Sequence, residues 1–182
     1  TGFIGENGKG THEYNNVMGK IDVITGTLGK ALGGGSGGFS SGKKEIIDLL
    51  RQKSRPYLFS NTLAPSIVGA SLKAIELIEN DKNLITRLKE NTIYFRKKIS
   101  EIGFEIKGKD HPIIPVMIYD ELKAKKIADF LYENGIYVVN FSYPVVPRGL
   151  SRIRLQISSS HTQRQMDEAI KLFKKAGLKF GL

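Results

Sequence analysis

The 182-residue sequence contains no cysteine at all. This absence excludes a disulfide framework, a thiolate zinc site and a cysteine nucleophile. The three histidines, His12, His111 and His161, lie far apart and show no metal-ligand spacing, so we expect no metal. No apolar run approaches the roughly 18 residues that a membrane-spanning helix needs, and we expect no membrane contact.

Acidic residues are fewer than basic ones: 18 Asp and Glu against 28 Lys and Arg, a net charge of +10. Such an excess permits nucleic-acid binding. The basic residues are spread over several segments and mixed with acidic ones, as on solvated helix faces. No RNA-binding aromatic signature or zinc-finger spacing accompanies them. We therefore expect no nucleic-acid partner, and a basic nucleic-acid-binding module is kept only as the non-enzyme alternative.

Hydrophobic periodicity gives a coarse secondary structure. Residues 21–28 predict a short buried strand. Helices are predicted over about 43–53, 65–79, 82–102, 122–134 and 163–176, and strands over 113–118, 136–139 and 152–157. Residues 55–61 are predicted as a loop or a short extended segment, because Pro56 cannot occupy a central strand. The alternation predicts an α/β first part and a smaller α+β part after about residue 80.

Particular residues are expected to shape these helices. Pro65 should lie in the first turn of its helix, and Gly135 should end the helix over 122–134. Ser160, Thr162 or a neighbour should cap the last helix. The apolar residues of the helix over 43–53 are predicted to face inward; they are Ile46, Ile47, Leu49 and Leu50.

The segment from Thr25 to Gly34 places Lys30 directly after the first predicted strand. A nucleotide-binding P-loop would require Gly, four residues and then Gly-Lys-Ser/Thr. Here Ile24 occupies the position of the first glycine and Ala31 that of the hydroxyl residue. The segment therefore gives poor support to ATP or GTP binding.

A lysine after a buried strand has another use. Desolvation lowers the pKa of a lysine, and the neutral amine can form a Schiff base with an aldehyde. The hydroxyls of Thr25 and Thr27 could bind a phosphate beside it. A surface lysine in a glycine-rich turn explains the same spacing, so the pattern alone leaves both interpretations open.

Four ordered motifs extend over essentially the whole chain. They are the glycine-rich stretch 5–14, the lysine segment 25–34, the segment 55–65 and the stretch 143–154 with its two arginines. Together they resemble the α-oxoamine synthase family of fold type I pyridoxal 5′-phosphate (PLP) enzymes. The resemblance implies an α/β fold: the C-terminal portion of the PLP-dependent transferase (aspartate aminotransferase-like) large domain over 1–79, then a small α+β domain over 80–182.

The resemblance also implies roles for the cofactor-binding residues. Lys30 would carry PLP covalently and then act as the proton-transfer base. Thr27 would bind the cofactor phosphate in the same subunit, whereas Ser60 and Asn61 would reach it across a homodimer interface. The pattern equally allows Ser60 and Asn61 to cap the helix that begins at Pro65.

Arg154 is implied as the ligand of the substrate carboxylate, which a planar guanidinium binds through two parallel hydrogen bonds. Strand alternation puts Arg152 on the same face. The pattern alone cannot choose between the two arginines, and only the resemblance favours Arg154.

Within the family, Thr11-His12-Glu13-Tyr14 and residues 59–63 most resemble the members that condense glycine with acetyl-CoA in threonine degradation. We therefore expect glycine and acetyl-CoA or CoA as partners, in the cytoplasm or, in a eukaryote, the mitochondrion. The alternatives within the family use other acyl donors, to make 8-amino-7-oxononanoate, 5-aminolevulinate or a sphingoid base.

The sequence starts at Thr1 without a methionine. In the family pattern, the Asp that pairs with the pyridinium nitrogen and the His that stacks on the ring precede the residues aligned with Thr1. We therefore expect this chain to be the C-terminal part of a longer enzyme, with little or no transferase activity alone.

Overall fold

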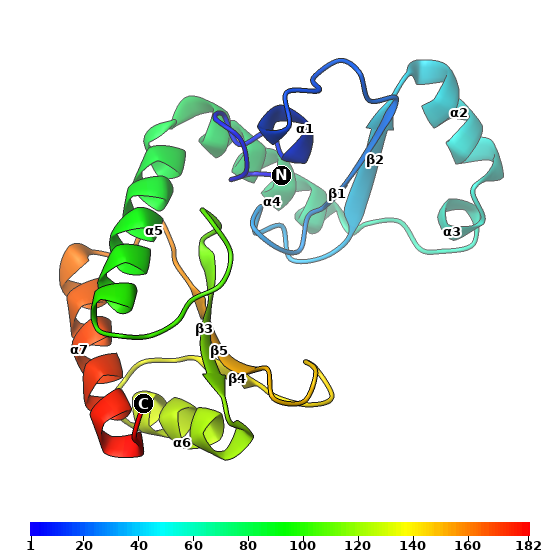
Figure 1. The fold of residues 1–182 in the computed structure, drawn as a ribbon. Coiled ribbons are helices and arrows are strands. Elements are labelled where there is room, and N and C mark those ends of the chain that lie inside the picture. Colours follow the sequence, from blue (N-terminus) through cyan, green and yellow to red (C-terminus); the bar gives the residue numbers. More distant parts are fainter. The chain divides into compact units, whose positions relative to one another are not determined.

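The computed structural model describes all residues from 1 to 182. The chain forms two compact units, Thr1–Ile85 and Thr86–Leu182 (Figure 1). The predicted domain division into 1–79 and 80–182 stays a prediction. None of the helices combines the length and the apolar character needed to cross a membrane.

The first unit holds one antiparallel strand pair and several helices. Its elements are α1 (Thr11–Tyr14), β1 (Val23–Thr27), β2 (Gly38–Gly42), α2 (Lys44–Lys53), α3 (Arg55–Leu58) and α4 (Pro65–Asn80). In the pair, Val23 lies opposite Gly42 and Thr27 opposite Gly38. The helix α5 (Asn83–Glu101) begins at the end of this unit and continues into the second.

The structure corrects three predictions in the first unit. The strand predicted over 21–28 exists as β1, but its side chains are exposed or only half-buried, because β2 is its single partner strand. Two residues predicted to face inward on α2, Leu49 and Leu50, are exposed. Residues 55–58 form the short helix α3 rather than a loop, because Pro56 lies in its first turn, where a missing N–H costs nothing.

The small number of buried side chains distinguishes the first unit. Its buried apolar residues are Leu28, Leu32 and Ile85, and its buried polar residue is Ser71. On α4, by contrast, Val68, Leu72 and Ile75 are exposed. The first unit therefore has far less apolar core than the second.

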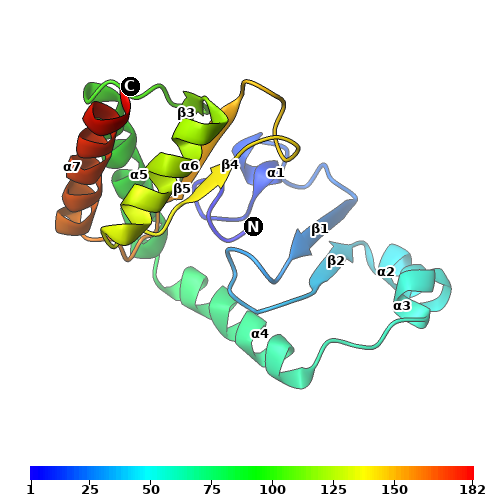
Figure 2. The same ribbon diagram turned by 90° about the horizontal axis from the view of Figure 1, so that it is seen from below.

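The second unit is a three-stranded antiparallel sheet with helices on one face. Its further elements are β3 (Ile113–Tyr119), α6 (Glu121–Glu133), β4 (Val139–Phe141), β5 (Ser151–Gln156) and α7 (Gln163–Phe180). The strand order is β3-β5-β4, so β5 is central. The helices α5, α6 and α7 lie together on one side of the sheet (Figures 1 and 2).

A single apolar core fills the space between the sheet and the three helices. The fully buried side chains Ile99, Ile114, Leu131, Ile153 and Phe173 come from α5, β3, α6, β5 and α7 in that order. Because the three helices and the strands β3 and β5 all contribute buried residues to one cluster, the second unit is an α+β unit, as the sequence predicted.

Most predicted helix boundaries of the second unit are confirmed. Thr162 caps α7 in a reciprocal pair with Gln165. The strand predicted over 136–139 is found three residues later, as β4. The reason lies at the end of α6, where Gly135 has a φ of 86° and Ile136 donates its backbone N–H to the carbonyl of Leu131, 2.8 Å away. That bond closes the helix and delays the strand.

Candidate active site

Lys30 lies in the loop that joins β1 to β2. Leu28 donates its backbone N–H to Gly37 and accepts from Gly34, at 2.9 and 2.8 Å, and Gly33 donates to the carbonyl of Lys30 at 2.9 Å. These bonds close the loop into a compact turn. The side chains of Leu28 and Leu32 are buried on either side of Lys30 in the sequence, whereas Lys30 itself is exposed. The loop is thus anchored by two leucines and presents the amine between them.

The last residue of β1, Thr27, lies three positions before Lys30. Its Oγ1 donates to the carbonyl of Gly37 at 3.3 Å, and its side chain is exposed. The hydroxyl oxygen keeps its acceptor capacity, and its hydrogen can rotate toward another acceptor. Thr27 and Lys30 thus lie three residues apart at the turn of the β1–β2 hairpin, whose second strand the sequence did not predict.

The glycines of this loop pack closely on other backbone and side chains. A β-carbon on Gly34 would lie 2.2 Å from Oγ of Ser71, and one on Gly37 would lie 2.2 Å from Cδ2 of Leu63. Gly37 also has a φ of 78°, which other residues rarely adopt. A side chain at Gly34 or Gly37 would therefore collide with Ser71 or Leu63, and the close packing of the loop requires glycine at both positions.

Ser60 and Asn61 lie in the exposed segment between α3 and α4. The alternative that they cap α4 is wrong, because the N-cap residue is Ala64 and no side chain bonds the first turn. Their hydroxyl and amide groups are therefore exposed donors in the first unit.

The glycine-rich stretch before α1 folds around the carboxylate of Glu13. That carboxylate accepts bonds from the backbone N–H of Asn7 and of Lys9, at 3.1 and 3.0 Å, and from Nδ2 of Asn7 at 2.8 Å. Partial desolvation raises the pKa of Glu13, but the bonds from Asn7 and Lys9 outweigh it and the pKa is lowered. Sequence reasoning missed this role, although Glu13 follows a stretch rich in glycine.

Arg152 and Arg154 lie on the face of β5 that faces away from the helices. The strand alternates buried Ser151, Ile153 and Leu155 with the two arginines. Arg152 donates Nε to the carbonyl of Leu150 at 3.0 Å. Arg154 lies over the ring of Phe141, 5.6 Å from its centroid.

A buried arginine fixes the segment that leads into β3. Arg96 donates to the carbonyls of Lys107, Gly108, His111 and Ile113, at 3.0 to 3.4 Å. Burial lowers the pKa of Arg96, and the charge of Asp110 opposes that shift. The pKa of His111 is also lowered, first by burial and then by the charge of Arg96, with a smaller effect from Arg154.

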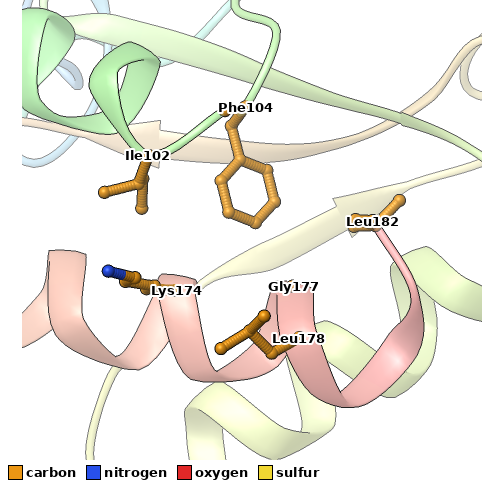
Figure 3. A pocket seen from close by; sticks show the side chains of 7 residues that line it. Ile102, Phe104, Lys174, Gly177, Leu178 and Leu182 are labelled. Carbon is orange, nitrogen blue, oxygen red and sulfur yellow. The ribbon is translucent and has the colours of Figure 1, made fainter.

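A small groove lies at the end of α7 in the second unit (Figure 3). It has a volume of about 120 Å³, and its walls are mainly apolar. The lining residues are Ile102, Gly103, Phe104, Lys174, Gly177, Leu178 and Leu182. It contains none of the predicted site residues, and Lys174 has no acid or base partner in the lining. It therefore offers no catalytic arrangement.

A family model for aminotransferase class I and II matches residues 2–173. The chain therefore belongs to the aminotransferase class I and II family.

Curated relatives narrow the comparison within that family. The chain is 53% identical over 181 residues to the 2-amino-3-ketobutyrate coenzyme A ligase of Escherichia coli K12, covering 100% of this chain and 46% of the relative. It is 45% identical to the human mitochondrial 2-amino-3-ketobutyrate coenzyme A ligase, covering 97% and 42%. It is 43% identical to the 8-amino-7-oxononanoate synthase of Petrotoga mobilis, covering 99% and 46%. The chain thus spans about half the length of these relatives.

Solved structures show the same fold. The serine palmitoyltransferase of Sphingomonas wittichii matches with a TM-score of 0.93 and 27% identity, covering all of this chain and 46% of that one. The serine palmitoyltransferase of S. paucimobilis with a bound PLP–myriocin aldimine matches with a TM-score of 0.91 and 29% identity, with the same coverage. The predicted fold class, a portion of the PLP-dependent transferase fold, is confirmed.

Proposed function

We propose that this chain is the lysine-bearing part of a PLP-dependent acyltransferase that condenses glycine with acetyl-CoA to give 2-amino-3-ketobutyrate and CoA. The observation that carries the proposal is the 53% identity to 2-amino-3-ketobutyrate coenzyme A ligase over 181 residues. Lys30 lies on a hairpin loop anchored by the buried Leu28 and Leu32. Its side chain is exposed in this chain, so the desolvation that the sequence suggested is not found here, and the assignment of Lys30 rests on the identity to the relatives.

The groups on this hairpin suit a phosphorylated aldehyde. Lys30 offers a primary amine, and Thr27 offers a hydroxyl three residues before it. When bound, PLP supplies a ring that withdraws electrons from the substrate carbon. Nζ of Lys30 would hold the cofactor and, once glycine has entered, take the α-proton of glycine.

The remaining polar groups would orient the ligands. Thr27 would bind the cofactor phosphate within its own subunit, and Ser60 and Asn61 would bind it from the second subunit of a homodimer. Their exposure, with no cap made to α4, supports this assignment. Arg154 would bind the carboxylate of glycine through paired N–H donors. In this arrangement 1–79 belongs to the large domain and 80–182 to the small one.

The chain by itself would have little or no activity. It covers 46% of the length of its bacterial relative, and the family's ring-pairing Asp and ring-stacking His are not assigned within it. The small core of the first unit is consistent with packing against further chain. A soluble compartment fits the proposal: the cytoplasm of a bacterium or, as the name of the human relative indicates, a mitochondrion.

The test joins this chain to the upstream part of the Escherichia coli relative and compares it with the 182-residue chain. With PLP, glycine and acetyl-CoA, we expect CoA release from the joined protein and not from the chain alone. Lys30→Ala should abolish both the PLP absorbance band and the activity, whereas the exposed Lys20→Ala should change neither. A band and activity that survive Lys30→Ala would overturn the lysine assignment. Robust CoA release by the isolated chain would contradict the proposal that it lacks half the site.

A second candidate differs only in the acyl donor. The 43% identity to an 8-amino-7-oxononanoate synthase supports it. Comparing acetyl-, succinyl-, pimeloyl- and palmitoyl-CoA in the joined protein separates the candidates. We expect the highest kcat/KM with acetyl-CoA, and a preference for any longer thioester would replace the first proposal by the second.

A further inference from the structure

The two arginines on the open face of β5 are engaged differently. Arg152 uses its Nε–H on the carbonyl of Leu150, at 3.0 Å. The guanidinium of Arg154 lies over the ring of Phe141 and has no carboxylate of the chain as a partner. An aromatic ring attracts the cation through its π face without supplying a lone pair. Arg154 therefore keeps its N–H donors for an external anion.

Strand register explains why Phe141 reaches Arg154. In the β4–β5 pair, Phe141 lies directly opposite Arg152, and Val139 lies opposite Arg154. Arg154 is thus the diagonal neighbour of Phe141, within reach of an aromatic side chain. On the other side of β5, Arg154 pairs with Pro115, which carries no charge. Both strands that flank Arg154 consequently present apolar groups to it.

We propose that Phe141 is a positioning residue that holds the guanidinium of Arg154 for the substrate carboxylate. The proposal rests on the proposed function, in which Arg154 binds glycine. A long arginine side chain loses rotamer entropy when it binds a ligand, and a side chain that is already ordered before the substrate arrives loses less. The ring would supply that order without competing for the donors. Arg152, already bonded to Leu150, is less available for the same role.

The structural contact can be tested in the 182-residue chain by ¹⁵N NMR of arginine Nε–H groups. Phe141→Leu removes the ring current, so we expect the Arg154 resonance to shift. The resonance of Arg164, which lies on α7 and bonds Glu168, should stay in place. An unchanged Arg154 resonance would overturn the proposal at its first step.

The role can be tested by kinetics in the protein joined to its upstream half. Because the contact orders a binding group in both ground and transition states, Phe141→Leu should raise the KM for glycine about two- to fivefold, with kcat and the KM for acetyl-CoA unchanged. Phe141→Tyr, which keeps the ring, should restore the wild-type KM. The control Tyr137→Leu removes an exposed ring of the same unit and should change neither constant.

The outcomes separate the two proposals. A lower kcat together with raised KM values for both glycine and acetyl-CoA, without rescue by Phe141→Tyr, would indicate a merely structural role. That result would overturn the proposal. If Phe141→Leu does not fold, Phe141→Met replaces it, and a wild-type glycine KM in that variant has the same consequence. Arg154→Gln tests the underlying assignment, because an unchanged glycine KM there would overturn the carboxylate role of Arg154 itself.

Discussion

A β-carbon placed on Gly5 would lie 2.2 Å from Oε2 of Glu13. The carboxylate cannot simply move away, because Asn7 and Lys9 donate hydrogen bonds to it. Gly5 also has a φ of 90°, in a region that L side chains rarely adopt. The absence of a side chain at Gly5 and the carboxylate of Glu13 together set the shape of the glycine-rich stretch.

Gly5→Ala should therefore destabilise this stretch through both strain and lost hydrogen bonds. Gly19→Ala is the matched control, because Gly19 has a φ of 75° but no atom within 4 Å of the added carbon. We expect Gly5→Ala to lower the free energy of unfolding by about 1–3 kcal/mol more than Gly19→Ala. Hydrogen exchange at the Asn7 and Lys9 amides measures the loss, and equal effects of the two variants would contradict the account.

Arg96 should contribute more to the free energy of unfolding than an exposed arginine does. Arg96→Met would leave four backbone carbonyls without their donor, at an expected cost of about 2–4 kcal/mol in unfolding free energy. Arg164, an exposed residue that pairs with Glu168, is the control, and Arg164→Met should cost about 1 kcal/mol or less. Urea unfolding measures both effects. Similar midpoints for the two variants would contradict the expected stabilisation by the hydrogen bonds of Arg96.

The lowered pKa of His111 predicts a pH dependence with a definite sign. Burial and the charge of Arg96 favour the neutral ring, so the folded-state pKa lies below the unfolded value near 6.5. The stability that His111 contributes is present above that value and is lost as pH falls through the folded-state pKa. His111→Asn removes the titration while keeping an acceptor for the Ile113 N–H, which now bonds Nδ1 at 3.0 Å.

We therefore expect a shallower loss of urea-unfolding stability below pH 6.5 in His111→Asn than in the unaltered chain. Glu13 also has a lowered pKa, and its contribution is lost in a more acidic range, below about 4.5. The two effects can thus be separated by pH. Identical profiles of the variant and the unaltered chain between pH 6.5 and 5 would refute the assignment to His111.

The two units should differ strongly in stability, because their cores differ in size. Phe173 is completely buried in the second unit, so Phe173→Ala should lower the free energy of unfolding by about 3–5 kcal/mol. Leu72, 64% exposed on α4, should change stability by no more than about 0.5 kcal/mol on Leu72→Ala. Hydrogen exchange should be slowest in β5 and α7 and fast throughout the first unit. Equal hydrogen-exchange protection of the amides of β1 and β5 would contradict the expected difference in stability between the two units.

Local sequence signals predicted most helices well. The periodic segments that became α4, α5, α6 and α7 carry their own starts and stops, such as Pro65, Thr162 and Gly135, so their limits depend little on the rest of the fold. The predictions that were wrong depended on partners. Leu49 and Leu50 of α2 form an apolar face that the periodicity detects, but burial requires another element against it.

The candidate site divides in the same way. The motif around Lys30 singled out the lysine but not the hairpin that carries it, because the strand β2 was not predicted. Alternation along β5 identified Arg152 and Arg154 as neighbours on one face. Neither pattern revealed Phe141, because its contact with Arg154 is diagonal across two strands and follows only from their register. The hydrogen-bonding role of Glu13 was not predicted for a similar reason: its hydrogen bonds depend on the path of the glycines before it.

The sequence by itself determined the family, the longer helices and the chemical groups, because those follow from local periodicity and from residue order in the motifs; the short helices α1 and α3 were not predicted. Only the tertiary structure decided which groups are buried, bonded or left exposed. In the fold, Lys30 is exposed between two buried leucines, and neither Ser60 nor Asn61 caps α4. Arg154 contacts the ring of Phe141, whereas Arg152 bonds the carbonyl of Leu150. The physical reason is that burial and hydrogen bonding belong to pairs of segments, and their pairing is fixed by the fold and not by either segment alone.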